Sequence, residues 1–140
     1  MTVPAEVHTV SEVSGQDGAT PVDLSRLLAR DYWLILSTPT AGTDQAAVDV
    51  HVEQHVAWLL ELERTGVLLV SGPLLSGPGI GPGSGAAAVR AADEDAARLI
   101  AKSDPFVLAG LRTFEVHRWR LNEGSICVQL SLGTGTYEWR

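Results

Sequence analysis

The sequence is short of the residues that several functional classes require. Cys127 is the only cysteine among 140 residues, so an intramolecular disulfide and a metal site built from several thiolates are excluded. Ten basic residues stand against 17 acidic ones, which gives a net charge of −7. Tight binding to nucleic acid or to an anionic membrane needs clustered Lys and Arg, so we expect neither partner.

Long apolar segments are also missing. No apolar run approaches the ~20 residues that a transmembrane helix needs. The first residues contain no basic region followed by an apolar core, so we expect no secretory signal and a cytoplasmic location. By contrast, 45% of the residues are hydrophobic and only 19% are charged, which is enough to bury a core. The length fits one domain of roughly 100–150 residues.

The chain divides into an N-terminal arm, residues 1–28, and a folded domain, residues 29–140. Ser, Thr, Gly, Pro and acidic residues interrupt any apolar pattern in the arm. Asp23 could nevertheless cap a short helix that carries three leucines. Those leucines indicate that the short helix packs on another surface, such as a partner subunit.

Apolar periodicity predicts the elements of the domain. Short branched and aromatic runs predict strands, and apolar residues at helical spacing predict helices. Thr43 is the expected N-cap of the first helix, Asp93 that of the second, and Gly66 the residue that ends the first. The predicted elements are strands at 32–36, 67–72, 86–90 and 111–121, helices at 43–65 and 93–103, and an added strand at 125–132.

This order predicts an α+β fold, a ferredoxin-like βαββαβ plait with an extra C-terminal strand. Both helices can cover only one face of such a sheet. The first strand is nevertheless apolar on both faces, and Trp119 lies on the face away from Phe114. Exposed apolar area costs about 25 cal/mol per Å², so we expect a second copy of the chain to cover that face as a homodimer.

The long predicted helix carries two histidines, His51 and His55, four residues apart. Such a pair shares one helix face, as metal ligands do, and Glu53, Asp104 or His117 could supply a third ligand. Only two ligands are local where three or four are usual, so the preferred interpretation has no metal.

His55 falls within the apolar stripe of its helix. A histidine there is more often structural than catalytic, although imidazole titrates near working pH and can act as a general acid or base. Asp104 precedes Pro105, a pair that often ends a helix and begins a turn. A carboxylate held at such a corner could also orient a histidine and select its tautomer. The residues alone leave both alternatives open.

Other candidates carry weaker signals. The Gly- and Pro-rich loop at 76–85 lacks the Lys-Ser/Thr ending of a phosphate-binding loop, which favours a mobile connection or a lid. Ser71 has no nucleophile-elbow motif and Cys127 has no adjacent base, so neither is expected to be a nucleophile. Trp33 and the other tryptophans are expected in the core or an interface, although Trp119 could wall an aromatic ligand.

Two blocks of sequence resemble the YciI-like (YCII-related) family. The first, residues 55–73, combines a helix histidine, a glycine at the helix end and a strand that closes in Gly-Pro. The second combines an acidic, alanine-containing helix start at 93–97 with an Asp-Pro-aromatic and Ala-Gly stretch at 104–110. Together the blocks cover roughly residues 32–119, and their order and spacing make the resemblance specific.

The resemblance implies a ferredoxin-like fold that assembles as a dimeric α+β barrel. It also implies a site made of the helix histidine and an aspartate, here His55 and Asp104. Some members of the family are dehydrochlorinases that remove HCl from chlorinated hydroquinones without a cofactor, so no cofactor is expected. The N-terminal arm, the Gly-Pro loop and the added strand depart from the family pattern and could reshape the cleft.

We therefore expect a cofactor-independent lyase or isomerase that acts on a small aromatic or carbonyl-containing molecule. His55 would abstract or relay a proton, and Asp104 would orient its imidazole. The expected substrate-binding residues are Trp119, His117, Ser71 and Trp33. The first two of these would line the barrel cavity. The alternative is a non-catalytic protein that binds a small molecule or partners another enzyme.

Overall fold

The computed structural model describes residues 21–81 and 83–139. Most of the predicted N-terminal arm, residues 1–20, therefore lies outside the described residues. The end of the arm forms a 3-10 helix, η1, Leu24–Arg26, and the Asp23 carboxylate accepts a hydrogen bond from the Ser25 amide at 3.0 Å, which confirms the predicted cap. Leu24 and Leu28 are exposed in this single chain.

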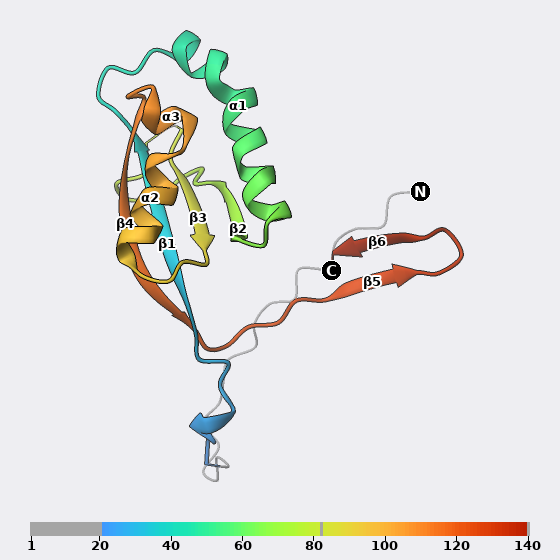
Figure 1. Cartoon of the computed structure of the whole chain (residues 1–140). Helices are drawn as coiled ribbons and strands as arrows, with labels where there is room; N and C mark the ends of the chain where they lie inside the picture. Colours follow the sequence, from blue (N-terminus) through green and yellow to red (C-terminus); the bar gives the residue numbers. More distant parts are fainter. Residues whose placement is uncertain (1–20, 82, 140) are drawn as a thin grey trace.

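Four antiparallel strands form the main sheet (Figure 1). Their bounds are β1 Arg30–Pro39, β2 Leu68–Pro73, β3 Gly85–Val89 and β4 Arg112–Leu121. The spatial order β2-β3-β1-β4 puts the two sequence-distant strands β1 and β4 side by side. This is the order of a ferredoxin-like plait, so the predicted α+β fold is confirmed.

Three helices accompany the sheet: α1 Gln45–Arg64, α2 Glu94–Lys102 and α3 Pro105–Leu108. The N-cap of α1 is Asp44 and not Thr43 as predicted, because the Asp44 carboxylate accepts from the Ala46 amide at 3.3 Å while the Thr43 hydroxyl donates to the Thr40 carbonyl. Gly66 follows α1 with a φ of 74°, as a helix-ending glycine should. No helix within the described residues is long and apolar enough to cross a membrane.

The core lies on the helix-covered face of the sheet. Ile35, Leu68 and Val89 from three strands are buried there against Ala101 of α2, and Leu59 of α1 packs on them. None of the described residues forms a layer over the opposite face, and Trp119 on that face is 38% exposed. The helices therefore cover one face only, as the element order predicted.

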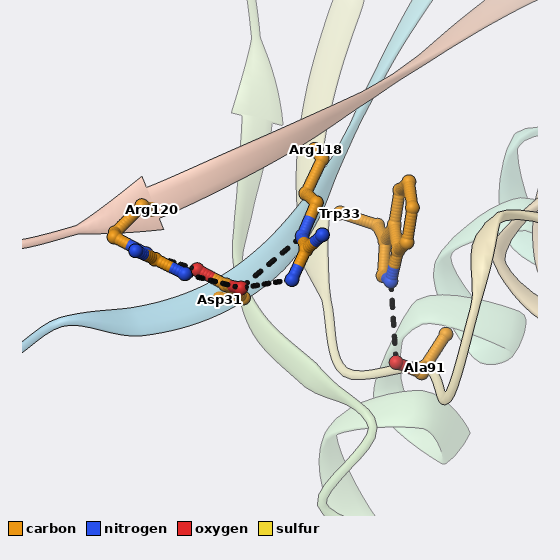
Figure 2. Close-up of polar contacts among 5 residues, drawn as sticks. All are labelled: Asp31, Trp33, Ala91, Arg118 and Arg120. Atoms are coloured by element: carbon orange, nitrogen blue, oxygen red, sulfur yellow. Dashed lines mark hydrogen bonds and ion pairs between the residues drawn. The ribbon is translucent and has the colours of Figure 1, made fainter.

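Side chains also join β1 to β4 at the far end of the sheet. Asp31 of β1 accepts hydrogen bonds from the guanidinium groups of Arg118 and Arg120 of β4 (Figure 2). The hydrogen bonds from these two arginines, Arg120 first, hold the pKa of Asp31 far below its ordinary value.

The predicted extra C-terminal strand is present as β5, Val128–Ser131, but it pairs with a further strand, β6 Thr136–Trp139, and not with the main sheet. In Figure 1 this hairpin extends away from the end of β4. Gly135, with a φ of 66°, donates its amide to the Ser131 carbonyl and closes the turn. This turn brings β6 back beside β5, so β5 pairs with β6. The strand pattern in the sequence did not predict this pairing.

Candidate active site

Two side chains that are 49 residues apart in the sequence meet beside the core. His55 Nδ1 of α1 lies 2.8 Å from Asp104 Oδ1, and the two side chains are 17% and 7% exposed. A carboxylate only accepts hydrogen bonds, so this contact places a hydrogen on Nδ1. The other ring nitrogen, Nε2, has no hydrogen-bond partner among the described residues and is the atom able to give or take a proton.

The corner between α2 and α3 fixes Asp104. Its backbone is extended, with a φ of −59° and a ψ of 125°, as the following Pro105 requires. Asp104 is the N-cap of α3, and its Oδ1 also accepts a hydrogen bond from the Phe106 amide at 2.9 Å. Asp104 therefore does both things that the sequence left open: it begins the turn into α3 and it contacts His55.

Aromatic rings hold the imidazole of His55. The centres of the Phe106 and Trp58 rings lie 4.5 Å and 5.7 Å from its own. The Trp58 indole donates to the Ser103 hydroxyl at 3.0 Å, which ties α1 to the end of α2. This packing restricts the rotation of the imidazole and keeps it against Asp104.

A cavity of about 310 Å³ lies beside this pair, between α1 and the helix-covered face of the sheet. We call it the His55 cavity. Besides the pair, its lining includes Val52, Trp58, Ser71, Ser84, Arg112 and Phe114. A mainly apolar cavity of this size with a few polar groups is typical of a site for a small organic molecule.

A sequence-family model described as the YCII-related domain matches residues 32–120, well over half of the chain. The chain belongs to the YCII-related family. The matched region runs from β1 to the end of β4 and contains both His55 and Asp104. A comparison with curated proteins found no match.

The structure of this YCII-related chain is similar to that of 5-chloro-2-hydroxyhydroquinone dehydrochlorinase from Burkholderia phenoliruptrix AC1100, solved as a complex with 2,5-dihydroxybenzoquinone. The two chains are 28% identical, and the TM-score is 0.51. The similarity covers 63% of this chain and 92% of that chain. Nearly all of the dehydrochlorinase therefore has a counterpart here.

One of the four residues predicted to bind substrate lines the His55 cavity in this YCII-related chain. That residue is Ser71, from β2. Trp33 lies in β1 and packs against the core, but it is outside the cavity lining. Its indole donates a hydrogen bond to the Ala91 carbonyl at 3.2 Å, the contact drawn in Figure 2. The structure therefore gives Trp33 a packing contact at a different part of the same face.

The other two, His117 and Trp119, lie on the face away from the helices, opposite Leu34 and Tyr32 of β1. Side chains alternate along a strand, so Phe114 points to the helices and lines the His55 cavity. The sequence thus predicted correctly that His117 and Trp119 lie opposite Phe114. The His55 cavity is on the Phe114 side of the sheet, and His117 and Trp119 are not among its lining residues. Their role in substrate binding stays a prediction.

The two helix histidines make separate contacts. His51 Nδ1 lies 2.9 Å from the Ala47 carbonyl oxygen, one turn earlier in α1, whereas His55 Nδ1 contacts Asp104. Between residues 21 and 139, Pro82 excepted, no three His, Cys, Asp or Glu side chains come together as a possible metal site.

Arg112, Ser84 and Phe106 line the His55 cavity but were not predicted as site residues. A signal for Arg112 existed: it precedes Phe114 by two residues in β4, and residues two apart share a face of a strand. Ser84 had no such signal, because its position depends on how the loop before β3 returns to the sheet. Burial lowers the pKa of Arg112, and the Asp104 carboxylate partly opposes that effect.

Proposed function

We propose that this YCII-related protein is an enzyme of the lyase or isomerase class that acts on a small organic molecule in the His55 cavity. His55 is the proton-transferring group, Asp104 is its positioning residue, and the reaction needs no metal or organic cofactor. The observation that carries the proposal is the 2.8 Å contact between His55 Nδ1 and Asp104 Oδ1 at the wall of a cavity.

The proposed chemistry follows from Nε2 of His55, the ring nitrogen that has no hydrogen-bond partner among the described residues. With hydrogen on Nδ1, Nε2 has a lone pair that takes a proton from a carbon or hydroxyl next to a carbonyl or phenol of the substrate. Asp104 then faces an imidazolium and stabilises its charge, and the same nitrogen returns the proton to the product or to solvent. General acid–base catalysis of this kind contributes roughly 10²–10⁴-fold to the rate.

The structural similarity to a dehydrochlorinase supports this class of reaction. Loss of HCl from an organic molecule needs a base that takes a proton while the electron pair of the broken C–H or O–H bond moves into the molecule and chloride leaves. His55 fits the role of that base. The bound quinone of the neighbour also supports a ring-sized ligand, since the His55 cavity has about 310 Å³.

We also propose that the protein forms a homodimer through the sheet face that the helices leave uncovered. That face carries Trp119, and Val70 of β2, which is 56% exposed. Burying such residues against a second sheet would stabilise the pair of chains, because apolar area is removed from water. Size-exclusion chromatography at micromolar concentration tests this proposal, and a monomer there would contradict it.

The test of the catalytic proposal compares wild type with His55→Gln. Both proteins are incubated with 5-chloro-2-hydroxyhydroquinone, with chloride release as the readout, and with small ketones and phenols in D₂O, with deuterium uptake by NMR as the readout. We expect wild type to turn over at least one compound and His55→Gln to lose roughly 10²–10⁴-fold. A folded His55→Gln protein with full activity would refute the proposal.

The non-catalytic alternative makes a different prediction. A binding protein would show no turnover of any compound by wild type, although ligands found by screening would bind it. Circular dichroism and thermal melting establish that the variant is folded before either result is interpreted.

A further inference from the structure

The His55 cavity has a positively charged end that the proposed proton transfer does not use. Arg112 is the first residue of β4, and its side chain lies on the helix-covered face. The carbon at the centre of its guanidinium lies 4.2 Å from the centre of the Phe106 ring. The same ring contacts the imidazole of His55, so one aromatic side chain touches both the cation and the proposed proton acceptor.

The guanidinium of Arg112 lies beside the start of β3. A Cβ built on Gly85, the first residue of β3, would lie 3.7 Å from Nη1 of Arg112 and 3.6 Å from the Ser37 hydroxyl, both ordinary van der Waals distances. Gly85 and Arg112 both line the His55 cavity.

No described residue neutralises Arg112. Its side chain makes no hydrogen bond and no ion pair within 4.0 Å among residues 21–81 and 83–139, although the charge of Asp104 acts on it. The accepting oxygen of Asp104 already holds two other donors, from His55 and Phe106. A half-buried guanidinium is costly to keep without a partner, and it stays charged at any working pH.

Ser84, beside Gly85 in the sequence, is a second polar group without a partner. It lines the same cavity and is 1% exposed, and no described atom forms a hydrogen bond with its hydroxyl. Buried hydroxyl groups nearly always have a hydrogen-bond partner. The lining of the His55 cavity therefore contains both a buried hydroxyl and a guanidinium without hydrogen-bond partners among the described residues.

We propose that Arg112 forms a carboxylate-binding subsite, so that the substrate of the His55 cavity is a small, mainly apolar organic acid. The planar guanidinium presents paired N–H groups that match the two oxygens of a carboxylate. The mainly apolar lining receives the body of the ligand, and Phe106, which contacts both Arg112 and His55, lies between the two ends of the proposed site. This inference rests on the proposed function for the location of the site, and it adds the charge and class of the substrate.

The experiment uses benzoate and benzamide, which have nearly the same size and shape but differ in charge. Isothermal titration calorimetry, or ligand-observed NMR for weak binding, measures both affinities on the full-length protein. We expect wild type to bind benzoate about tenfold more tightly than benzamide, as for a single charge-assisted pair in a half-buried site. Equal affinities, or no benzoate binding in the millimolar range, would overturn the proposal.

Variants assign the preference to one side chain. Arg112→Met removes the charge at similar length, and its benzoate affinity should fall to within about twofold of its benzamide affinity. Arg98→Met is the matched control, because Arg98 is a partly exposed arginine of α2 that is paired with Glu94 and lies outside the cavity lining, and it should keep the wild-type preference. If Arg112→Met does not fold, Arg112→Gln serves the same purpose.

His55→Gln separates this inference from the proposed function. Binding needs no catalysis, so His55→Gln should retain the wild-type preference for benzoate even though it is expected to be inactive. Loss of the preference in His55→Gln with retention in Arg112→Met would assign the anion to the imidazole and overturn the subsite. Retention in His55→Gln with loss in Arg112→Met supports the subsite, whether or not His55 proves to be catalytic.

Discussion

The contact between Asp104 and His55 can be tested by a change that removes the charge but keeps the shape. Asp104→Asn replaces one carboxylate oxygen by an amide that donates. In wild type a single oxygen, Oδ1, accepts from both His55 Nδ1 and the Phe106 amide. An amide nitrogen in that place donates to His55 Nδ1, which moves the ring hydrogen to Nε2, and it leaves the Phe106 amide without that acceptor.

The structure sets the expected magnitudes. Asp104 accepts two hydrogen bonds, at 2.8 Å and 2.9 Å, and hydrogen bonds to a charged acceptor are stronger than neutral ones. Loss of the charge should therefore lower the free energy of unfolding by only about 1 kcal/mol. The wrong tautomer leaves no lone pair on Nε2, so kcat should fall by roughly 10²–10⁴-fold with little change in KM.

Asp93→Asn is the matched control. Asp93 caps α2 by accepting from the Ala96 amide at 2.8 Å, as Asp104 caps α3, but it makes no contact with His55. We expect Asp93→Asn to keep the wild-type stability in urea denaturation and Asp104→Asn to lose about 1 kcal/mol, and only Asp104→Asn to lose activity. The tautomer can be read without a substrate, from the ¹⁵N NMR signals of the His55 ring, which should report Nδ1–H in wild type and Nε2–H in Asp104→Asn.

Two results would refute this reasoning. One is an Nε2–H tautomer in the wild-type protein, because then Asp104 does not select the form that accepts a proton. The other is an Asp104→Asn protein that keeps its tautomer and its activity, since the carboxylate would then serve only as a helix cap.

Three further predictions concern stability and assembly. Arg120 and Arg118 depress the pKa of Asp31 (Figure 2), so the stabilising effect of this carboxylate is present above about pH 4 and is lost as the pH falls through the folded-state pKa. The difference in urea stability between wild type and Asp31→Asn should therefore be smaller at about pH 3 than at about pH 7. An equal difference at the two pH values would contradict this prediction. Ser84→Ala removes an unpaired buried hydroxyl and should raise the free energy of unfolding by about 1 kcal/mol, whereas a clear loss of stability would mean that a water or another group satisfies it. Trp119→Glu places a charge on the uncovered sheet face and should shift the protein from dimer to monomer in size-exclusion chromatography without unfolding it; a dimer that survives this change uses another surface.

Much of the fold was accessible from the sequence because its signals are local. Side-chain periodicity along a strand or a helix depends only on neighbouring residues, so the order of the four main strands and two main helices could be predicted. Asp23 and Asp93 cap helices as predicted because a cap needs only the next two or three amides. Thr43 was predicted as the cap of α1, but the entry of the chain into the helix gave that role to its neighbour Asp44.

The site combined local and long-range information. His55 and Asp104 stood out by residue type and by family resemblance, but no local pattern brings together groups that are 49 residues apart. Their contact exists because α1 and the corner before α3 pack on the same face of the sheet. The alternation of side chains along β4 indicated which residues share a face with Phe114, but it did not indicate which face of the sheet contains the cavity.

The sequence by itself determined the type and order of the four main strands and two main helices, the caps at Asp23 and Asp93, and the two faces of each strand, since these follow from a few adjacent residues. Only the tertiary structure decided that the His55 cavity lies under the helices, that Arg112 and Ser84 reach it without partners among the described residues, and that β5 pairs with β6 in a separate hairpin. The physical reason is that cavities, unpaired charges and strand pairing arise from how distant segments fit together. Such packing is a property of the whole fold and cannot be predicted from the hydrophobic periodicity of any one helix or strand.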